Sequence, residues 1–294
     1  MYTKSILLLC FVQSSLFASL FDTGGIVSES LKKDCSFYSV KSWIERRKER
    51  QCCYYNPWRV SDVFGWVLKD AFCINWNLLT WDSFKIVTTI FPFYISARMV
   101  DQKLQNCFFD FDCMKNKHCV PHWCKEVARV SVAPVIAFFG INAFLNRDDR
   151  LRTTSQVMLI GLPFVFYVAQ LAKYWQCDAS LRPWHEKFCK NGSRSNGGLP
   201  SGHTAKASYL AVLYGLEYGP KAAIPLGILT AFVGSAFVAC NRHYLSQVIA
   251  GVGFGALYGA AAHKTVQKEL EDLWSFDFYT DDCARPGFCA RYRF

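Results

Sequence analysis

The sequence predicts an all-α protein, a transmembrane bundle of about six helices preceded by a polar and amphipathic extension. Of the 294 residues, 52% are hydrophobic and only 19% are charged, below the roughly 25% charged residues usual in soluble domains. Apolar stretches near the length of a membrane span recur after residue 83. Strand-like alternation is not sustained anywhere, and this composition excludes a disordered or collagen-like chain.

The first 18 residues have the features of a secretory signal peptide. Lys4 precedes an apolar run that ends at Ala18, a small residue at a plausible cleavage site. An uncleaved membrane anchor is the alternative, because Leu16 is larger than the residue usually found in its place before the cut. Both interpretations bring the chain to a membrane and an oxidising compartment.

Residues 19–82 form a polar, basic, cysteine-containing extension. Its charged stretch 41–50 predicts a solvated or membrane-surface helix and no nucleic-acid binding, since no aromatic platform or binding motif accompanies it. Residues 60–81 mix large apolar side chains with Lys69 and Asp70, so they predict an amphipathic helix at the membrane interface.

The membrane domain is expected over residues 83–265, with a C-terminal tail over 266–294. Its apolar stretches lie at residues 83–99, 127–145, 156–175, 203–219, 222–240 and 243–262. A soluble all-α domain with buried helices is the alternative.

Three glycines in the last apolar stretch, Gly251, Gly255 and Gly259, follow one another at intervals of four residues. They share one helix face, and such small residues let another membrane helix approach closely.

Three further stretches carry chemistry. In the first, residues 198–205, Ser201 and Gly202 begin an apolar helix, whose free N–H groups would make an anion site. His203 would face the bound anion. A capped helix with a surface histidine is the alternative.

The second stretch, residues 173–183, offers the positive charges of Lys173 and Arg182, although such residues are also common at membrane boundaries. In the third stretch, residues 241–251, His243 and Gln247 lie four residues apart on one helix face. The Gln247 carbonyl could accept a hydrogen bond from His243.

In this order the three motifs resemble those of the type 2 phosphatidic acid phosphatase (PAP2) superfamily. The resemblance covers roughly residues 83–265 and rests on Arg182-Pro183, Pro200-Ser-Gly-His203 and His243-Tyr-Leu-Ser246. It implies a phosphatase in which His243 attacks phosphorus to form a phosphohistidine, and His203 acts as general acid and base.

The resemblance also implies a set of phosphate ligands and no metal or other cofactor. The expected ligands are Lys173, Arg182, Ser201, Gly202 and, less directly, Arg242.

The sequence departs from the family pattern at three places. Lys173 lies two residues farther from Arg182 than is usual, Phe237 stands where the family has an arginine, and Gln247 replaces the aspartate that partners the nucleophile.

Two functions therefore stay open. One is a membrane phosphatase acting on a phosphomonoester or diphosphate of a lipid, such as phosphatidate, a polyprenyl diphosphate or a lipid A type molecule. The other is a degenerate member that binds phosphate or lipid without efficient catalysis; a phosphotransferase using the same intermediate is less favoured.

The 14 cysteines favour disulfide bonds in an oxidising compartment. Cys240 is expected to be a lone thiol, and a Cys177–Cys189 bridge could brace the loop around Arg182. The remaining cysteines expected to pair are 35, 52, 53, 73, 107, 113, 119, 124, 283 and 289. A zinc site between residues 107 and 124 is the alternative, but its spacing fits no standard zinc finger.

Six spans would place the site on the side of the loop 101–126, which we expect to be the exterior or periplasm. The loop with Arg147, Arg150 and Arg152 would then be cytoplasmic, as positive charge prefers. The same count conflicts with a cleaved signal peptide unless residues 60–81 cross the membrane.

Overall fold

The computed structural model describes residues 60–110, 115–116, 122–146, 148–174, 181–183, 197–271, 274–280 and 286–292. The predicted signal peptide, most of the extension and the Cys177–Cys189 bridge lie outside these residues.

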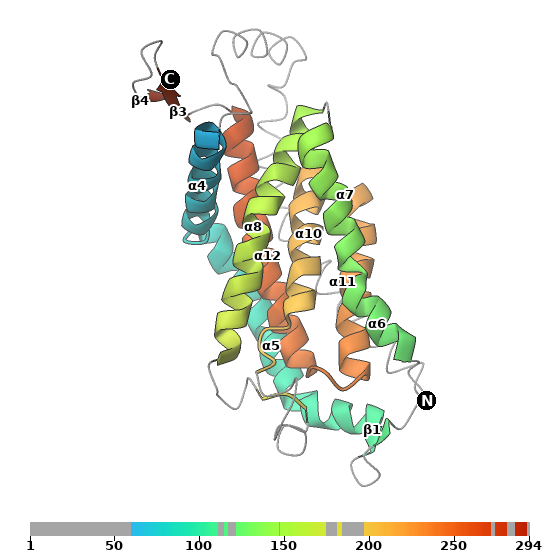
Figure 1. The fold of residues 1–294 in the computed structure, drawn as a ribbon. Coiled ribbons are helices and arrows are strands. Elements are labelled where there is room, and N and C mark those ends of the chain that lie inside the picture. The colour runs from blue at the N-terminus through green and yellow to red at the C-terminus, as the bar shows by residue number, and fades with distance from the viewer. Residues whose placement is uncertain are drawn as a thin grey trace.

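The described chain is a bundle of long helices (Figure 1). The helices are α4 (Val60–Asn77), α5 (Trp81–Phe108), α6 (His122–Val130), α7 (Val132–Leu145), α8 (Asp149–Tyr174), α10 (Gly202–Tyr218), α11 (Pro220–Ala239) and α12 (Leu245–Glu271). The six predicted apolar stretches fall in α5, the α6–α7 pair, α8, α10, α11 and α12. The predicted helical bundle is therefore confirmed, although the expected domain boundary at residue 265 falls inside α12.

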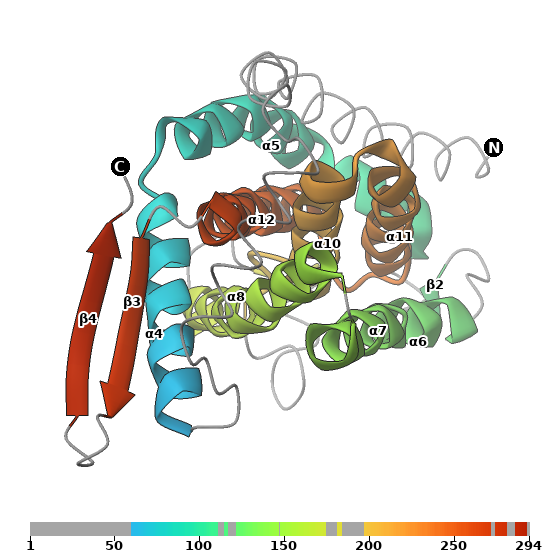
Figure 2. The same cartoon turned by 90° about the horizontal axis from the view of Figure 1, so that it is seen from above.

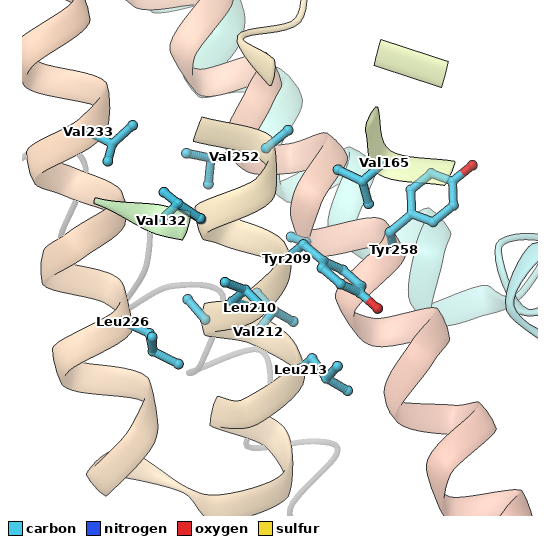
Figure 3. Packing of buried hydrophobic residues seen from close by; sticks show 14 of the residues in the cluster. Val132, Val165, Tyr209, Leu210, Val212, Leu213, Leu226, Val233, Val252 and Tyr258 are labelled. Atoms are coloured by element: carbon cyan, nitrogen blue, oxygen red, sulfur yellow. The ribbon is translucent and has the colours of Figure 1, made fainter. Parts of the chain in front are cut away.

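Helix α10 is the central helix of the bundle. Seen from above, it lies between α11 and α12, with α8 beside it (Figure 2). Its side chains Tyr209, Leu210 and Leu213 are fully buried and point among residues of the neighbouring helices, such as Val233 and Val252 (Figure 3). The Pro200-Ser-Gly-His203 motif therefore begins the most enclosed helix of the described chain.

The glycine face of α12 packs against α10, as predicted. A Cβ atom at Gly251 would lie 2.6 Å from the carbonyl oxygen of Ser201, and one at Gly255 would lie 2.8 Å from the backbone nitrogen of Tyr209. Backbone atoms cannot move aside as a flexible side chain can, so only glycine permits this approach. The contact fixes α12 against the start of α10.

Large apolar side chains cover the outside of the bundle. Examples are Phe91 at 59% exposure, Phe144 at 74%, Leu171 at 67% and Ile228 at 66%. Monomeric soluble proteins rarely expose apolar patches on this scale. By length and composition, four stretches can cross a membrane: Trp123–Leu145, Arg150–Tyr174, Pro220–Ala239 and Leu245–Leu270. These helices and the apolar outer surface support a membrane protein.

Residues 60–77 of the predicted interfacial segment form helix α4. Leu68, Phe72 and Trp76 are exposed along it, whereas Asp70 and Ile74 are buried. The helix lies outside α8 and α12 (Figure 2), and Lys69 forms a 2.6 Å ion pair with Glu269 of α12.

The fold is mostly helical, as predicted, and two short hairpins accompany the helices. Strands β3 (Trp274–Thr280) and β4 (Pro286–Tyr292) pair antiparallel in the C-terminal tail, and β1 (Phe109–Asp110) pairs with β2 (Lys115–Asn116). Trp274, Phe276 and Phe278 alternate with Ser275 and Asp277, so a short strand signal exists in β3. A seven-residue run is easily overlooked beside helices that are several times longer.

The disulfide prediction finds no support among the described residues. Cys73, Cys107 and Cys124 carry free thiols, contrary to their expected pairing. Cys73 lies on α4, away from the end of the bundle where Cys107 and Cys124 lie, so it cannot pair with either of them. Cys240 is also a free thiol, as expected.

Candidate active site

The three predicted motifs meet at one end of the bundle, the lower end in Figure 1. There α8 ends, α10 begins, and a short turn joins α11 to α12. The side-chain Nε2 of Gln247 donates a 2.6 Å hydrogen bond to the carbonyl oxygen of Leu181, next to Arg182. The backbone carbonyl of Gln247 accepts a 3.0 Å hydrogen bond from the N–H of Ser201. One residue thus joins all three motifs.

Gln247 also holds the turn that carries His243. Its Oε1 atom lies 3.3 Å from Nδ1 of His243 and accepts a 3.3 Å hydrogen bond from the N–H of Tyr244. The side chain is fully buried and packs on Gly198, where a Cβ atom would lie 2.7 Å from Cδ of Gln247. The hydrogen bond expected between His243 and Gln247 is therefore present.

This hydrogen bond determines the tautomer of His243. Because the amide oxygen of Gln247 can only accept, Nδ1 of His243 must carry the proton. The other ring nitrogen, Nε2, then keeps its lone pair and is free to act as a nucleophile.

Burial lowers the pKa of His243 well below the ordinary value of 6.5, and the nearby positive charges of Arg182 and Lys173 lower it further. The imidazole is therefore neutral near neutral pH. A neutral ring is the form that can attack phosphorus, so the charge environment suits a nucleophile.

Helix α5 supports this turn through residues that the sequence patterns did not single out. The carboxylate of Asp101 accepts hydrogen bonds from Ser246, one from the hydroxyl group and one of 3.0 Å from the backbone N–H. It thereby caps the start of α12. Gln105 donates a 2.6 Å hydrogen bond to Oδ1 of Asn241, which has a positive φ of 57°. Only the folded bundle brings these residues beside the turn.

Positive charges gather around the two histidines. His203 lies near the charges of Lys206, Lys173, Arg129 and Arg182. The backbone carbonyl of Lys173 accepts a 3.1 Å hydrogen bond from the N–H of Gly197, which ties the end of α8 to the segment before α10. A Cβ atom at Gly202 would lie 3.4 Å from Nζ of Lys173, so the expected ligands Lys173 and Gly202 are adjacent.

The N-terminus of α10 has no side-chain cap. Ser201 occupies the capping position, but its hydroxyl group lies 2.9 Å from that of Thr204 instead of bonding a backbone N–H. The first N–H groups of a helix lack partners inside the helix and attract anions. At this site the backbone N–H groups are therefore better hydrogen-bond donors to a phosphate than the buried hydroxyl group of Ser201.

The ring of Phe237 contacts both histidine rings. Its ring centroid is 5.0 Å from that of His203 and 5.9 Å from that of His243, and its backbone carbonyl accepts a 2.9 Å hydrogen bond from the N–H of Arg242. The position where the PAP2 pattern has an arginine thus holds an apolar side chain that packs against both histidines.

The side chain of Arg242 carries its charge near the thiol of Cys240. Its role as a phosphate ligand stays a prediction. Among the described residues, no cluster of three or more histidine, cysteine or acidic side chains could hold a metal ion. The alternative zinc site falls largely on residues outside the described part.

Fold and site together define a helical membrane protein. At one end of its bundle it carries a pair of histidines and positively charged side chains that could bind an anion. Residues 157–271 match the model of the PAP2 superfamily, and this range contains all three motifs. The part of the chain that carries the three motifs is therefore similar to the PAP2 superfamily.

Related proteins carry phosphatase names. The chain is 29% identical over 168 residues to a non-specific acid phosphatase of Salmonella typhimurium. The aligned region covers 52% of this chain and 67% of that protein. It is 36% identical over 134 residues to a lipid A 1-phosphatase of Porphyromonas gingivalis, covering 44% of this chain but only 28% of that protein.

A solved structure, the transmembrane PAP2-type phosphatidylglycerolphosphate phosphatase of Bacillus subtilis, matches with a TM-score of 0.43 and 17% identity. The match covers 63% of this chain and 96% of that one.

Proposed function

We propose that the protein hydrolyses a phosphomonoester or diphosphate of a lipid, by way of a phosphohistidine on His243. The observation that carries the proposal is the hydrogen bond from Nδ1 of His243 to Gln247, which leaves Nε2 free beside an uncapped helix N-terminus. A lipid substrate is supported by the apolar outer surface of the helices that carry the site, and by the name of the lipid A 1-phosphatase relative.

In the proposed first step, Nε2 of His243 attacks phosphorus while His203 gives a proton to the departing oxygen. Lys173, Arg182 and the first N–H groups of α10 stabilise the negative charge on the phosphoryl oxygens. In the second step, His203 takes a proton from water, which attacks phosphorus and releases His243.

The test is phosphate release by the purified protein in detergent, with phosphatidate, a polyprenyl diphosphate and a lipid A type substrate. Turnover of at least one of them should disappear in His243→Ala. A His203→Ala variant should accumulate protein heavier by one phosphoryl group, measured by mass spectrometry of the intact chain. Turnover that survives in His243→Ala would overturn the mechanism.

Two residues favour a second candidate, a protein that binds lipid phosphate without efficient turnover. Phe237 brings no charge to the phosphoryl group, and Gln247 cannot stabilise a cationic imidazole by charge. In a serine protease, replacing the aspartate that partners the histidine costs roughly 10⁴ in rate. Tight phosphate binding with no turnover of any substrate would establish this alternative.

We further propose that the site faces the exterior or periplasm. The loop between α7 and α8, with Arg150 and Arg152 beside it, lies at the opposite end of the bundle, which would be cytoplasmic. Cys107 at the site end is exposed and free, so a membrane-impermeant maleimide should label it in intact cells. Labelling of Cys107 only after permeabilisation would reverse the orientation.

A further inference from the structure

Lys206 is a cation near the site that the family motifs do not include. It follows His203 by three residues on α10, so the two side chains share one helix face. Its charge acts on both His203 and Lys173. Within the described ranges, no carboxylate forms an ion pair with Lys206. Its Nζ atom lies 5.7 Å from the centroid of the Phe166 ring.

Lys206 lies deeper in the bundle than the other cations of the site. Helix α10 runs from the site toward the opposite end, so Lys206 starts about 4.5 Å further along the axis than His203. On α8, Phe166 precedes Lys173 by seven residues, or about 10 Å. An ammonium group beside Phe166 therefore lies on the membrane side of the site.

This position is costly unless an anion occupies it. Phe166 is 43% exposed on a helix that faces lipid, and Lys206 is half-buried beside it. Cationic side chains within membrane segments are expensive, and they commonly mark a binding site or pathway. The contact with an aromatic ring offsets only part of this cost.

Lys206 lies beside Phe166 of α8, where a lipid bound as proposed above would leave the site for the bilayer. The terminal phosphoryl group of this lipid would lie at His243, among Lys173, Arg182 and the start of α10, while its hydrocarbon tail must extend into the bilayer. The next group along the molecule then meets Lys206. In a monophosphate that group is a neutral carbon chain, whereas in a diphosphate it is a second, negatively charged phosphate.

We propose that Lys206 binds this second phosphate and makes the site selective for lipid diphosphates over lipid monophosphates. The inference rests on the proposed function and names the substrate class of the same site. As Nε2 of His243 bonds to the terminal phosphorus, the bond from that phosphorus to the bridging oxygen breaks. The electron pair stays on the bridging oxygen of the departing lipid monophosphate, which takes a proton from His203. Lys206 stabilises the charge of this leaving group.

The test compares a polyprenyl diphosphate with a polyprenyl monophosphate of the same chain length. Lys206→Met keeps the length of the side chain but removes its charge. We expect it to lower kcat/KM for the diphosphate about 10- to 100-fold more than for the monophosphate, the effect of one charge-assisted hydrogen bond. Lys206→Arg should restore most of the preference. Lys221→Met, at the far end of the bundle, is the matched control and should change neither value.

Equal losses on both substrates, or no loss on either, would overturn the role of Lys206. A wild-type protein that turns over neither substrate would instead contradict the proposed function. Binding then decides the question: calorimetry on His243→Ala should show that Lys206→Met weakens the binding of inorganic pyrophosphate much more than that of orthophosphate. Equal weakening of both anions would also refute the proposal.

Discussion

Gln247→Leu would remove the side chain that joins the proposed nucleophile, His243, to the loop before Arg182 while keeping a similar volume. Three groups would lose a partner: the buried Nδ1–H of His243, and the half-buried N–H of Tyr244 and carbonyl of Leu181. An unsatisfied buried polar group costs about 1–3 kcal/mol. The ring of His243 would also be free to rotate and to adopt the other tautomer.

We expect kcat to fall about 30- to 100-fold, which is about 2–2.7 kcal/mol in the barrier at 1.36 kcal/mol for each tenfold change. This is less than the roughly 10⁴-fold loss when a charged partner is replaced in a serine protease, because Gln247 carries no charge. KM should change little, since the phosphate-binding cations remain.

The assay is steady-state phosphate release in detergent, together with thermal unfolding. Gln267→Leu is the matched control, because Gln267 lies on the same helix and donates hydrogen bonds of 3.1 and 3.2 Å to the buried Glu217 at the far end. It should lower the unfolding temperature without lowering kcat. The reasoning is refuted if Gln247→Leu retains wild-type kcat, or if both variants lose kcat equally.

Three further predictions concern the same end of the bundle. Burial and the charges of Arg182 and Lys173 lower the pKa of His243, so kcat/KM should stay constant as the pH decreases until the pH is below the ordinary pKa range of histidine. Arg182→Gln should move this acid limb of the pH–rate profile to higher pH. An unmoved limb would count against His243 as the titrating group. Asp101→Ala should remove the cap of α12 and cost about 0.5–2 kcal/mol, seen as a lower unfolding temperature; an unchanged temperature would contradict the capping role. Gly255→Ala should force α12 away from α10 and cost about 1–3 kcal/mol; unfolding in denaturant measures it, and wild-type stability would show that the helices can separate freely.

The helices were predictable because each one shows its signal locally. A run of about 20 apolar residues predicts a span wherever it occurs, and α11 is the clearest instance, with no charged residue from Ala222 to Cys240. The weakest predicted stretch, 83–99, became the 28-residue helix α5. The charged residues in its C-terminal half made this part of the sequence look unlike a membrane helix. The structure explains them, because Asp101 faces α12 rather than lipid.

Much of the site could be predicted because the motif residues are near in sequence to the helix ends that carry them. His243 and Gln247 lie one helical turn apart, so their contact followed from helix geometry. The contact of Phe237 with both histidine rings and the cap supplied by Asp101 could not be predicted, since each depends on how separate helices meet. For Lys206, the sequence indicates only that it follows His203 by three residues and so shares its helix face. Its position beside Phe166 depends on how α8 packs against α10, which the sequence does not show.

The site lies at the mouth of the bundle, where the helices end, instead of halfway along them. Hydrolysis at that level would split one amphiphile at the boundary between two phases. The lipid product would remain in the bilayer, and the inorganic phosphate would diffuse away into water. For the proposed lipid substrate, the reverse reaction would therefore require the two products to meet again at this boundary.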